Sequence, residues 1–298
     1  MLDYASLSAL AAVVREGSFE RAARALSVTP SAVSQRIRLL EDRVGCALVI
    51  RGQPCTATEM GRRLCQHVDR VLILEQELQG ALPALAPDGP VRVSLPIAVN
   101  ADSLATWIVS AIAAYASESP VLMAVAVDDQ DHTAEWLQRG KVLAAVTGSA
   151  RAPVGCNSRP LGSMRYRAAA SPSFMARHFN AGVGAGSLAR APNLAFNTKD
   201  ELQSRWAHRL CHRHVELPSH GLPSPQAFVA ATVAGMGWGL HPEALVAPYL
   251  NEGSLVELIP ESPLDVPLYW QQARAASLLL DGLTRRVVAA AEAALIAA

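Results

Sequence analysis

The sequence lacks several features that define other classes of protein. Its 26 basic residues are balanced by 26 acidic ones, so the net charge gives no indication of a nucleic-acid partner or of disorder. Five cysteines are an odd number, which argues against a secreted fold built on disulfides. No apolar run reaches the roughly 18 residues of a membrane span, and no basic segment opens a signal peptide. We therefore expect a soluble cytoplasmic protein.

Motifs of enzyme chemistry are also missing. Neither G-x-S-x-G nor H-E-x-x-H occurs, and the glycine-rich stretches 182–186 and 235–239 lack the G-x-G-x-x-G spacing. We therefore predict no enzymatic activity, no metal site and no cofactor. Two cysteine-containing clusters each leave two interpretations open. The first cluster consists of His208, Cys211, His212 and His214; it could bind a metal ion, but a polar helix end at the surface is the favoured interpretation. The second cluster consists of Cys46, Cys55 and Cys65; it could act as a redox switch, but burial of the cysteines as small apolar residues is favoured.

The periodicity of the sequence predicts three parts. Apolar residues at helical spacing indicate helices over 4–17, 19–26 and 30–44, followed by a short strand over 47–51. A long helical pattern with a narrow apolar stripe begins at Thr58 and ends near Pro83, which is typical of a helix that packs on a partner helix. The segment PALAPDGP then marks a boundary. We predict a small helical domain over 1–58, a linker helix and hinge over 59–90, and a larger domain over 91–298.

The part over 91–298 alternates strand and helix patterns, which predicts an α/β fold with a parallel sheet. We expect two similar halves: lobe I at about 91–161 and 268–298, and lobe II at about 162–267. The predicted strands are 91–98, 121–127, 142–147, 166–171, 194–197, 239–241 and 264–271, and the predicted helices are 101–117, 133–139, 172–179, 202–213, 224–234 and 278–297.

The first three helices have the dimensions of a helix-turn-helix, whose last helix enters the major groove of DNA. Side chains on one face of that helix would read bases, since Gln and Arg can form paired hydrogen bonds with base edges. The predicted readers are Pro30, Ser31, Ser34, Gln35 and Arg38, and the predicted core is Ala22, Ala23, Leu26, Val33, Ile37 and Leu40. Up to residue 66 there are nine arginines and six acids, a local excess of 9 − 6 = +3. On spacing alone, an ordinary three-helix core is an equally good interpretation.

The run GSFERAARALSVTPSAVSQRIRLLEDRVGCALVIR resembles the winged helix-turn-helix of LysR-type transcriptional regulators. The resemblance extends over the chain. It implies a winged helix-turn-helix, a long dimerisation helix at about 59–83, and a two-lobed effector domain like that of periplasmic binding proteins. In this family Arg51 would lie in the wing. The wing sequence GQPCTATEMG is less basic than is common, which leaves further wing contacts in doubt.

Within that family, segments such as SLPIAVNADSLATW and AGMGWGLHPE resemble the ArgP/LysG branch, whose members sense lysine or arginine and control the export of basic amino acids. The resemblance implies an effector of this kind, promoter DNA and a second copy of the chain as partners, and RNA polymerase as a candidate partner. The alternatives are a LysR-type regulator with an unrelated effector, and an architectural DNA binder without one.

The effector site is expected where strands end between the two lobes, because ligands of open α/β sheets bind at the carboxyl ends of strands. Asn100 and Ser103 would hold the amino-acid backbone, and Asp102 and Asp129 would pair with a basic side chain. From the second lobe we add Asn197, Ser224 and Trp238. Each acid is equally well explained as a helix cap or a solvated turn.

Overall fold

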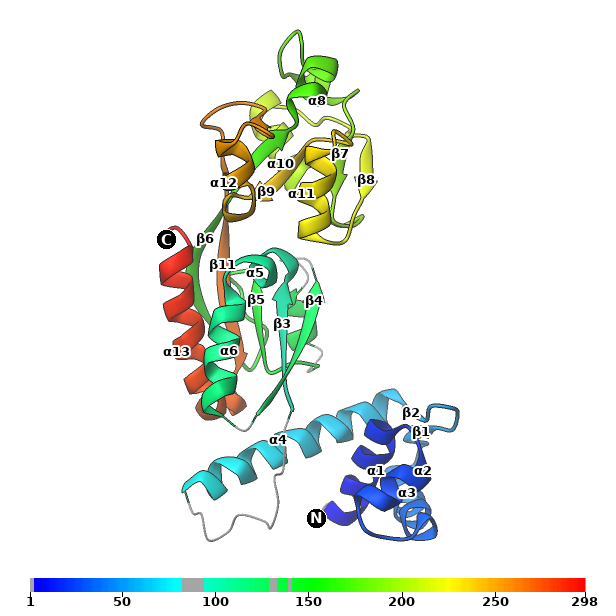
Figure 1. Ribbon diagram of the computed structural model, residues 1–298. Coiled ribbons are helices and arrows are strands. Elements are labelled where there is room, and N and C mark those ends of the chain that lie inside the picture. The colour runs from blue at the N-terminus through cyan, green and yellow to red at the C-terminus, as the bar shows by residue number, and fades with distance from the viewer. Residues whose placement is uncertain (1–2, 82–93, 120, 129–132, 139–140, 298) are drawn as a thin grey trace. The chain divides into compact units, whose positions relative to one another are not determined.

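The computed structural model describes residues 3–81, 94–119, 121–128, 133–138 and 141–297. The chain divides into two compact units, Met1–Ser94 and Leu95–Ala298 (Figure 1). The predicted linker 83–90 lies outside the described residues.

The smaller unit contains three short helices and a wing. The helices are α1 (Tyr4–Glu16), α2 (Phe19–Ala25) and α3 (Pro30–Val44). Capping fixes their bounds as the sequence predicted: the hydroxyl of Ser18 accepts a hydrogen bond from the amide of Arg21, and that of Thr29 from the amide of Ala32. Strands β1 (Val49–Ile50) and β2 (Thr56–Ala57) pair antiparallel and form the wing, and the long helix α4 (Glu59–Ala81) follows.

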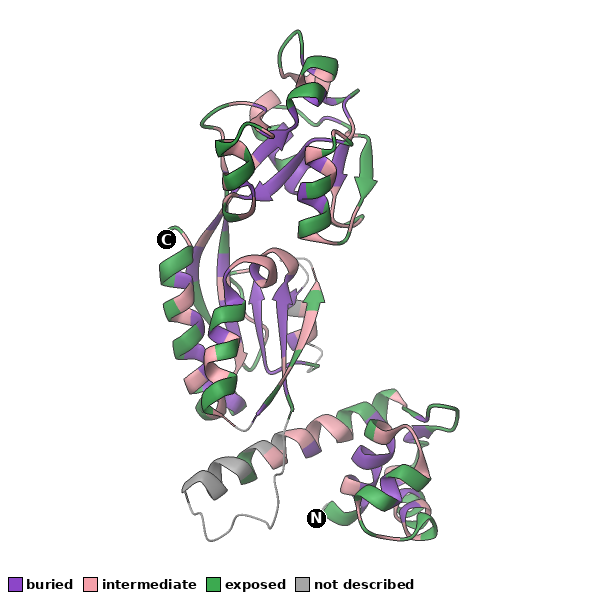
Figure 2. Ribbon diagram, viewed as in Figure 1, coloured by how far each residue is buried: buried purple, intermediate pink, exposed green. Residues whose placement is uncertain are grey.

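The core of the smaller unit lies between α1, α2 and α3, with α4 packed against α1 (Figure 2). Val33, Ile37 and Leu40 of α3 are at most 3% exposed, and Ala22 and Ala23 of α2 at most 1%. Leu26 is half-buried and packs on the same cluster. The predicted core is therefore confirmed. Val68 of α4 completes the cluster.

The larger unit is built on one mixed sheet with the strand order β10-β6-β11-β5-β3-β4, and β9 also pairs with β6. Its first half contains β3 (Ser94–Asn100), α5 (Ala101–Thr106), α6 (Ile108–Glu118), β4 (Leu122–Asp128), α7 (Thr133–Gln138) and β5 (Ala144–Thr147). Strands β3 and β5 are parallel, as predicted. Together with the C-terminal helix α13 (Ser277–Ala294), which packs beside α6, these elements form lobe I.

Lobe II packs around the other end of the sheet (Figure 1). Its elements are α8 (Pro172–His178), α9 (Ala185–Leu188), β7 (Asn193–Ala195), α10 (Leu202–Cys211), β8 (Ser219–Gly221), α11 (Pro225–Val233), β9 (Gly239–Pro242), α12 (Glu243–Asn251) and β10 (Val256–Glu257). Strands β7 and β8 are parallel, and the amide of Leu194 in β7 donates to the carbonyl of Trp238, beside β9.

Two long antiparallel strands join the lobes: β6 (Cys156–Ala170) and β11 (Leu264–Ala273). They pair from Leu264 with Tyr166 to Ala273 with Cys156. The register shifts between Leu268 and Tyr269, opposite Gly162, whose φ of 122° is accessible mainly to glycine. The irregularity therefore lies within the connection between the lobes.

The structure corrects three of the predicted elements and adds a helix that was not predicted. The single helix predicted over 101–117 is two helices, because the backbone of Trp107 leaves the helical region at φ −122°. The strand predicted over 166–171 begins ten residues earlier, at Cys156. The strand predicted over 47–51 is limited to Val49–Ile50. Helix α12 was not predicted, because Pro248 lies inside it.

Candidate DNA interface and effector site

The outer face of α3 presents the side chains predicted to read DNA. Pro30, Ser31, Gln35 and Arg38 are exposed, and Ser34 is half-buried. The opposite face is anchored in the core of the unit. Because Gln35 and Arg38 carry polar ends on a rigidly packed helix, they can meet base edges without reorganisation of the backbone.

The wing is fixed to the helices beside it. The carboxylate of Glu41 in α3 accepts hydrogen bonds from the amides of Leu48 and Val49, at 2.8 and 3.3 Å. The amide of Cys55 donates to the carbonyl of Gly17 at 2.8 Å. Arg51, the predicted wing contact, is exposed, and its guanidinium carbon lies 5.6 Å from the centre of the Phe19 ring. A cation–π contact of this kind holds the side chain near α2.

At the carboxyl end of β3, two of the predicted effector residues bury polar atoms without a partner. Asn100 is 1% exposed, and neither its amide nitrogen nor its amide oxygen has a hydrogen-bond partner. Ser103 is fully buried, and its hydroxyl also has none. Such atoms cost free energy unless something satisfies them. Both donors are therefore suited to a ligand with acceptor oxygens.

The third predicted residue at this end, Asp102, lines a pocket between the lobes. The hydroxyl of Tyr166, on the connecting strand β6, donates to its carboxylate at 2.7 Å. The rest of the pocket comes from lobe II: Phe196, Asp200, Leu202, Pro225, Phe228, Leu240, His241 and Pro242. A second carboxylate, Asp200, thus faces the same pocket as Asp102. Its two oxygens accept from the amides of Phe196 and Leu202, which fixes the loop after β7.

The pocket is small. Its volume is about 20 Å³, close to the space needed for one water molecule. Helix α5 of lobe I lies against α11 of lobe II. In the arrangement described, this pocket is therefore too small to hold a whole amino acid.

The residues predicted from lobe II have different environments. Asn197 follows the pocket residue Phe196, and its side-chain oxygen accepts from the amide of Lys199 at 2.7 Å. Ser224 precedes the pocket residue Pro225 and caps α11 by accepting from the amide of Ala227. Asp129 lies outside the described residues.

Trp238 lies in the core of lobe II rather than on an open surface. Its indole is fully buried, donates to the carbonyl of Ala191 at 3.3 Å, and packs on Trp206 with ring centres 5.5 Å apart. A side chain held in this way has no path to a ligand in the pocket, so we leave it out of the site. Sequence reasoning missed Asp200 and His241; the signal for Asp200 was its position just after the predicted strand 194–197.

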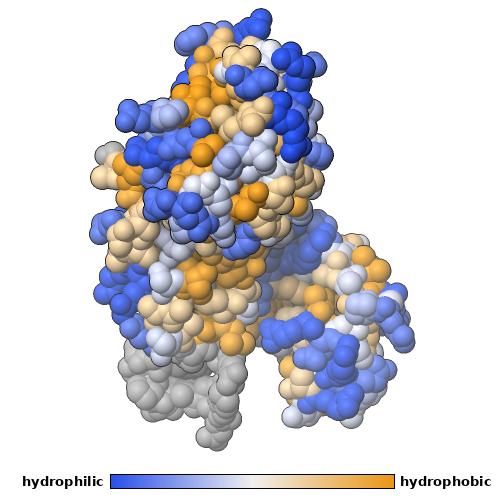
Figure 3. Space-filling view, turned by 45° about the horizontal axis from the view of Figure 1, so that its top comes forward, coloured by the Kyte–Doolittle hydropathy of each residue, from blue (hydrophilic) through white to orange (hydrophobic). Residues whose placement is uncertain are grey.

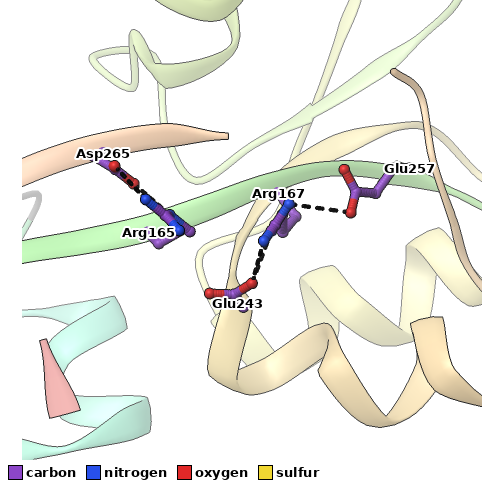
Figure 4. A network of polar contacts seen from close by, with 5 residues as sticks. All are labelled: Arg165, Arg167, Glu243, Glu257 and Asp265. Carbon is purple, nitrogen blue, oxygen red and sulfur yellow. Dashed lines mark hydrogen bonds and ion pairs between the residues drawn. The ribbon is translucent and has the colours of Figure 1, made fainter. Parts of the chain in front are cut away.

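Ion pairs brace the strands that connect the lobes (Figure 4). Arg165 in β6 binds Asp265 in β11 through two hydrogen bonds of 2.8 Å, and these hold the pKa of Asp265 below its usual value. Arg167, two residues further along β6, binds Glu243 of α12 at 2.6 Å and Glu257 of β10 at 3.3 Å. The arginines thereby tie β6 to β11 and to lobe II.

The described residues offer neither a metal site nor a membrane-spanning helix. In this part of the chain no group of three or more His, Cys, Asp or Glu side chains is placed to hold a metal ion. None of its helices is long and apolar enough to span a membrane. On the face shown in Figure 3, hydrophobic and hydrophilic residues are intermixed over the larger unit.

A winged helix-turn-helix joined to a two-lobed α/β domain defines a class of DNA-binding regulators with a ligand-binding domain. The chain belongs to the LysR family of this class. Residues 4–62 match the model of the bacterial regulatory helix-turn-helix proteins of the lysR family, and residues 87–292 match the LysR substrate binding domain. It is therefore a DNA-binding transcriptional regulator of a non-enzymatic family, as the sequence predicted.

Curated and solved relatives share nearly the whole length. The transcriptional regulator ArgP of Pseudomonas fluorescens (strain Pf0-1) is 46% identical over 97% of this chain and 96% of its own. The crystal structure of ArgP from Mycobacterium tuberculosis is 42% identical, covers 100% of both chains and has a TM-score of 0.83. The full-length LysG from Corynebacterium glutamicum with bound effector Arg is 37% identical over 99% of this chain and 100% of that one, with a TM-score of 0.71. The predicted resemblance to the ArgP/LysG branch is confirmed.

Proposed function

We propose that this regulator senses L-arginine or L-lysine between its two lobes. Two carboxylates from opposite lobes, Asp102 and Asp200, line one pocket, and this juxtaposition carries the proposal. A cationic side chain placed between them would gain charge-assisted hydrogen bonds. The related LysG of C. glutamicum, solved with bound effector Arg, supports the same ligand chemistry.

The unpartnered atoms at the end of β3 suit the other end of such a ligand. The side chains of Asn100 and Ser103 offer donors for an α-carboxylate, and the amide oxygen of Asn100 offers an acceptor for the α-amino group. Asn197, Ser224 and Asp129 are further candidates, from the loops that follow β7, precede α11 and follow β4.

The effector would act by biasing the separation of the lobes. Because a ligand shifts an equilibrium only by its difference in affinity for two states, arginine must bind one lobe arrangement more tightly than the other. The ion pairs on β6 and β11 give the connection between the lobes a defined geometry.

Calorimetric titration of the full chain with L-arginine, L-lysine and L-leucine tests the effector. We expect the two basic amino acids to bind and leucine not to.

Asp102→Asn keeps an acceptor for the Tyr166 hydroxyl but removes the charge, and should weaken arginine binding by about tenfold or more. Asp129→Ala tests the predicted residue outside the described part. Asp281→Asn, on the exposed side of α13, is the matched control and should leave affinity unchanged. Equal binding of leucine would contradict the proposal.

On the DNA side, we propose that residues 1–58 read a half-site through Ser31, Ser34, Gln35 and Arg38 at the start of α3, with Arg51 in the wing. Residues 59–90 would join this head to the regulatory domain 91–298, and two copies would pair through α4, placing two heads on neighbouring half-sites in the cytoplasm. Sedimentation equilibrium should show a dimer or tetramer at the concentrations that bind DNA, and a monomer would contradict the pairing. Contact with RNA polymerase stays a prediction.

Replacing Gln35 with alanine tests the readers. A paired glutamine–adenine contact contributes about 1–3 kcal/mol of discrimination, so Gln35→Ala should weaken binding to the operator by about 10- to 100-fold. Binding to non-specific DNA depends on phosphate contacts and should not change. If competition assays show both affinities falling equally, Gln35 is not a base-reading residue.

A further inference from the structure

His241, on strand β9, is a buried titratable residue that the proposed binding scheme does not yet use. Its side chain is 1% exposed, yet it lines the pocket that contains Asp102 and Asp200. The ring is held from two sides. The edge of Phe228 meets it with ring centres 5.2 Å apart, and the hydroxyl of Thr232 lies 3.1 Å from its Nε2.

The contact with Thr232 determines which ring nitrogen carries the proton. The Thr232 hydroxyl donates its single hydrogen to the carbonyl of Phe228 at 2.9 Å. With its hydrogen on that carbonyl, the hydroxyl accepts from His241, and this assignment places the ring proton on Nε2. Complete burial lowers the pKa of His241 to about 3, which keeps the ring neutral. In the neutral ring with hydrogen on Nε2, Nδ1 is a hydrogen-bond acceptor.

The crowding around the ring preserves this arrangement. A side chain at Gly239 would bring its Cβ to 2.7 Å from the Phe228 ring and 3.3 Å from Nε2 of His241. The absence of a side chain at Gly239 therefore lets Phe228 and His241 pack this close to the β9 backbone, and the Phe228 ring and the Thr232 hydroxyl hold the imidazole between them. The acceptor on Nδ1 is therefore oriented by the fold before any ligand binds.

We propose that His241 is a specificity-determining residue of the effector pocket, whose Nδ1 accepts a hydrogen bond from an N–H group on the ligand side chain, and that Thr232 positions it for this role. The inference rests on the proposed function, because it concerns the same pocket. Asp102 and Asp200 select positive charge, whereas His241 selects N–H donors. A guanidinium offers five donors and an ammonium three.

Three ligands separate the two kinds of recognition. L-arginine has both the charge and the donors, L-citrulline has N–H donors without the charge, and L-norleucine has neither. Wild-type protein should bind them in that order of affinity. Loss of the His241 acceptor should weaken arginine and citrulline by the same factor, because both ligands use it, whereas Asp102→Asn should weaken arginine alone.

Two substitutions of similar shape test the acceptor. His241→Asn keeps an acceptor near the position of Nδ1, and His241→Leu removes it. By calorimetry on the full chain we expect arginine to bind His241→Asn within about threefold of wild type and His241→Leu at least tenfold more weakly, or 1.4 kcal/mol. A role in packing alone would affect both variants alike, and equal affinities for the two would overturn the proposal.

Thr232 supplies an independent variant in case the ring substitutions disturb folding. Thr232→Val removes the acceptor that fixes the proton on Nε2, and Thr232→Ser retains it. We expect arginine binding to fall several-fold in Thr232→Val only. If wild-type protein binds arginine and all four variants bind it equally well, the role of His241 is excluded while the proposed effector stands. If wild-type protein binds neither arginine nor lysine, both proposals fail.

Discussion

The two units of this regulator differ in what they bury. Among the described residues of the smaller unit, Ser6 is the one fully buried polar side chain, and its hydroxyl donates to Asp3 at 2.5 Å; Nε2 of the half-buried His67 is the one buried polar side-chain atom there without a partner. The larger unit buries many polar side chains, and several have atoms without a partner, among them Asn100, Ser103 and Gln203. The DNA-binding head is thus stabilised mainly by hydrocarbon packing, whereas the effector unit keeps polar groups where a ligand can satisfy them.

The difference has a thermodynamic meaning. Hydrocarbon packing stabilises one arrangement of α1, α2 and α3 whatever else is present. A buried polar atom without a partner costs about 1–3 kcal/mol, and a ligand that supplies the partner recovers that free energy. Effector binding is therefore expected to raise the stability of the larger unit and to leave that of the smaller one nearly unchanged.

The largest expected effect comes from breaking the packed head. Ile37 of α3 is 1% exposed, and Ile37→Ala should destabilise the smaller unit by about 2–5 kcal/mol. Operator binding should fall accordingly, and calorimetric binding of arginine should persist, because the larger unit has its own core. Simultaneous loss of both activities would show that the two units do not fold independently.

The next effect concerns an unpartnered buried polar side chain of the larger unit. Asn100→Leu replaces an unpartnered buried amide with hydrocarbon of similar size, and should raise the stability of the larger unit by about 1–3 kcal/mol while abolishing arginine binding. Asn193→Leu is the matched control, because the Asn193 amide donates to the Pro218 carbonyl and the Ser219 hydroxyl. It should lower stability. Thermal unfolding without ligand measures both, and a fall in stability for Asn100→Leu would contradict the interpretation.

The effect that is smallest near neutral pH is a pH dependence confined to the larger unit. The pKa of His241 is about 3 in the folded protein, against 6.5 for an ordinary histidine, because of burial. The unfolded chain therefore binds more protons between these values, so this contribution to stability is complete above pH 6.5 and is lost as pH falls towards 3. The loss is up to about 1.4 kcal/mol per pH unit. Denaturant titrations at several pH values should show this slope in wild type and a smaller one in His241→Asn.

Local signals predicted the smaller unit well, and the larger unit only in part. Ser18, Thr29 and the residues around them fix helix bounds through contacts within a few positions, so the sequence alone located these helices. The first ten residues of β6 are paired with β11, about a hundred positions away, and no local pattern carries that information. The break at Trp107 was missed for the same reason: its neighbours favour one continuous helix.

The candidate site shows the same division. Asn100, Asp102 and Ser103 were predictable, because polar residues that directly follow an apolar strand mark the edge of a sheet. Asp200 and His241 belong to lobe II, and they reach this site only because the chain folds back beside β6 far along the sequence. Trp238 is fully buried and does not line this pocket, and an aromatic residue in a glycine-rich segment gives no indication of whether its ring faces a core or a ligand.

The paired connection between the lobes has a consequence for how such proteins diversify. The chain leaves lobe I along β6 and returns to it along β11, and the two strands are hydrogen-bonded side by side (Figure 1). Lobe II is thus an insertion whose entry and exit are adjacent. Its loops can be exchanged or its sequence drift without cutting the framework that carries β3, β5 and α13. Lobe II, which would supply one side of the proposed effector site, can therefore change in sequence independently of the rest, and new effector preferences can arise there while the DNA-binding unit stays the same.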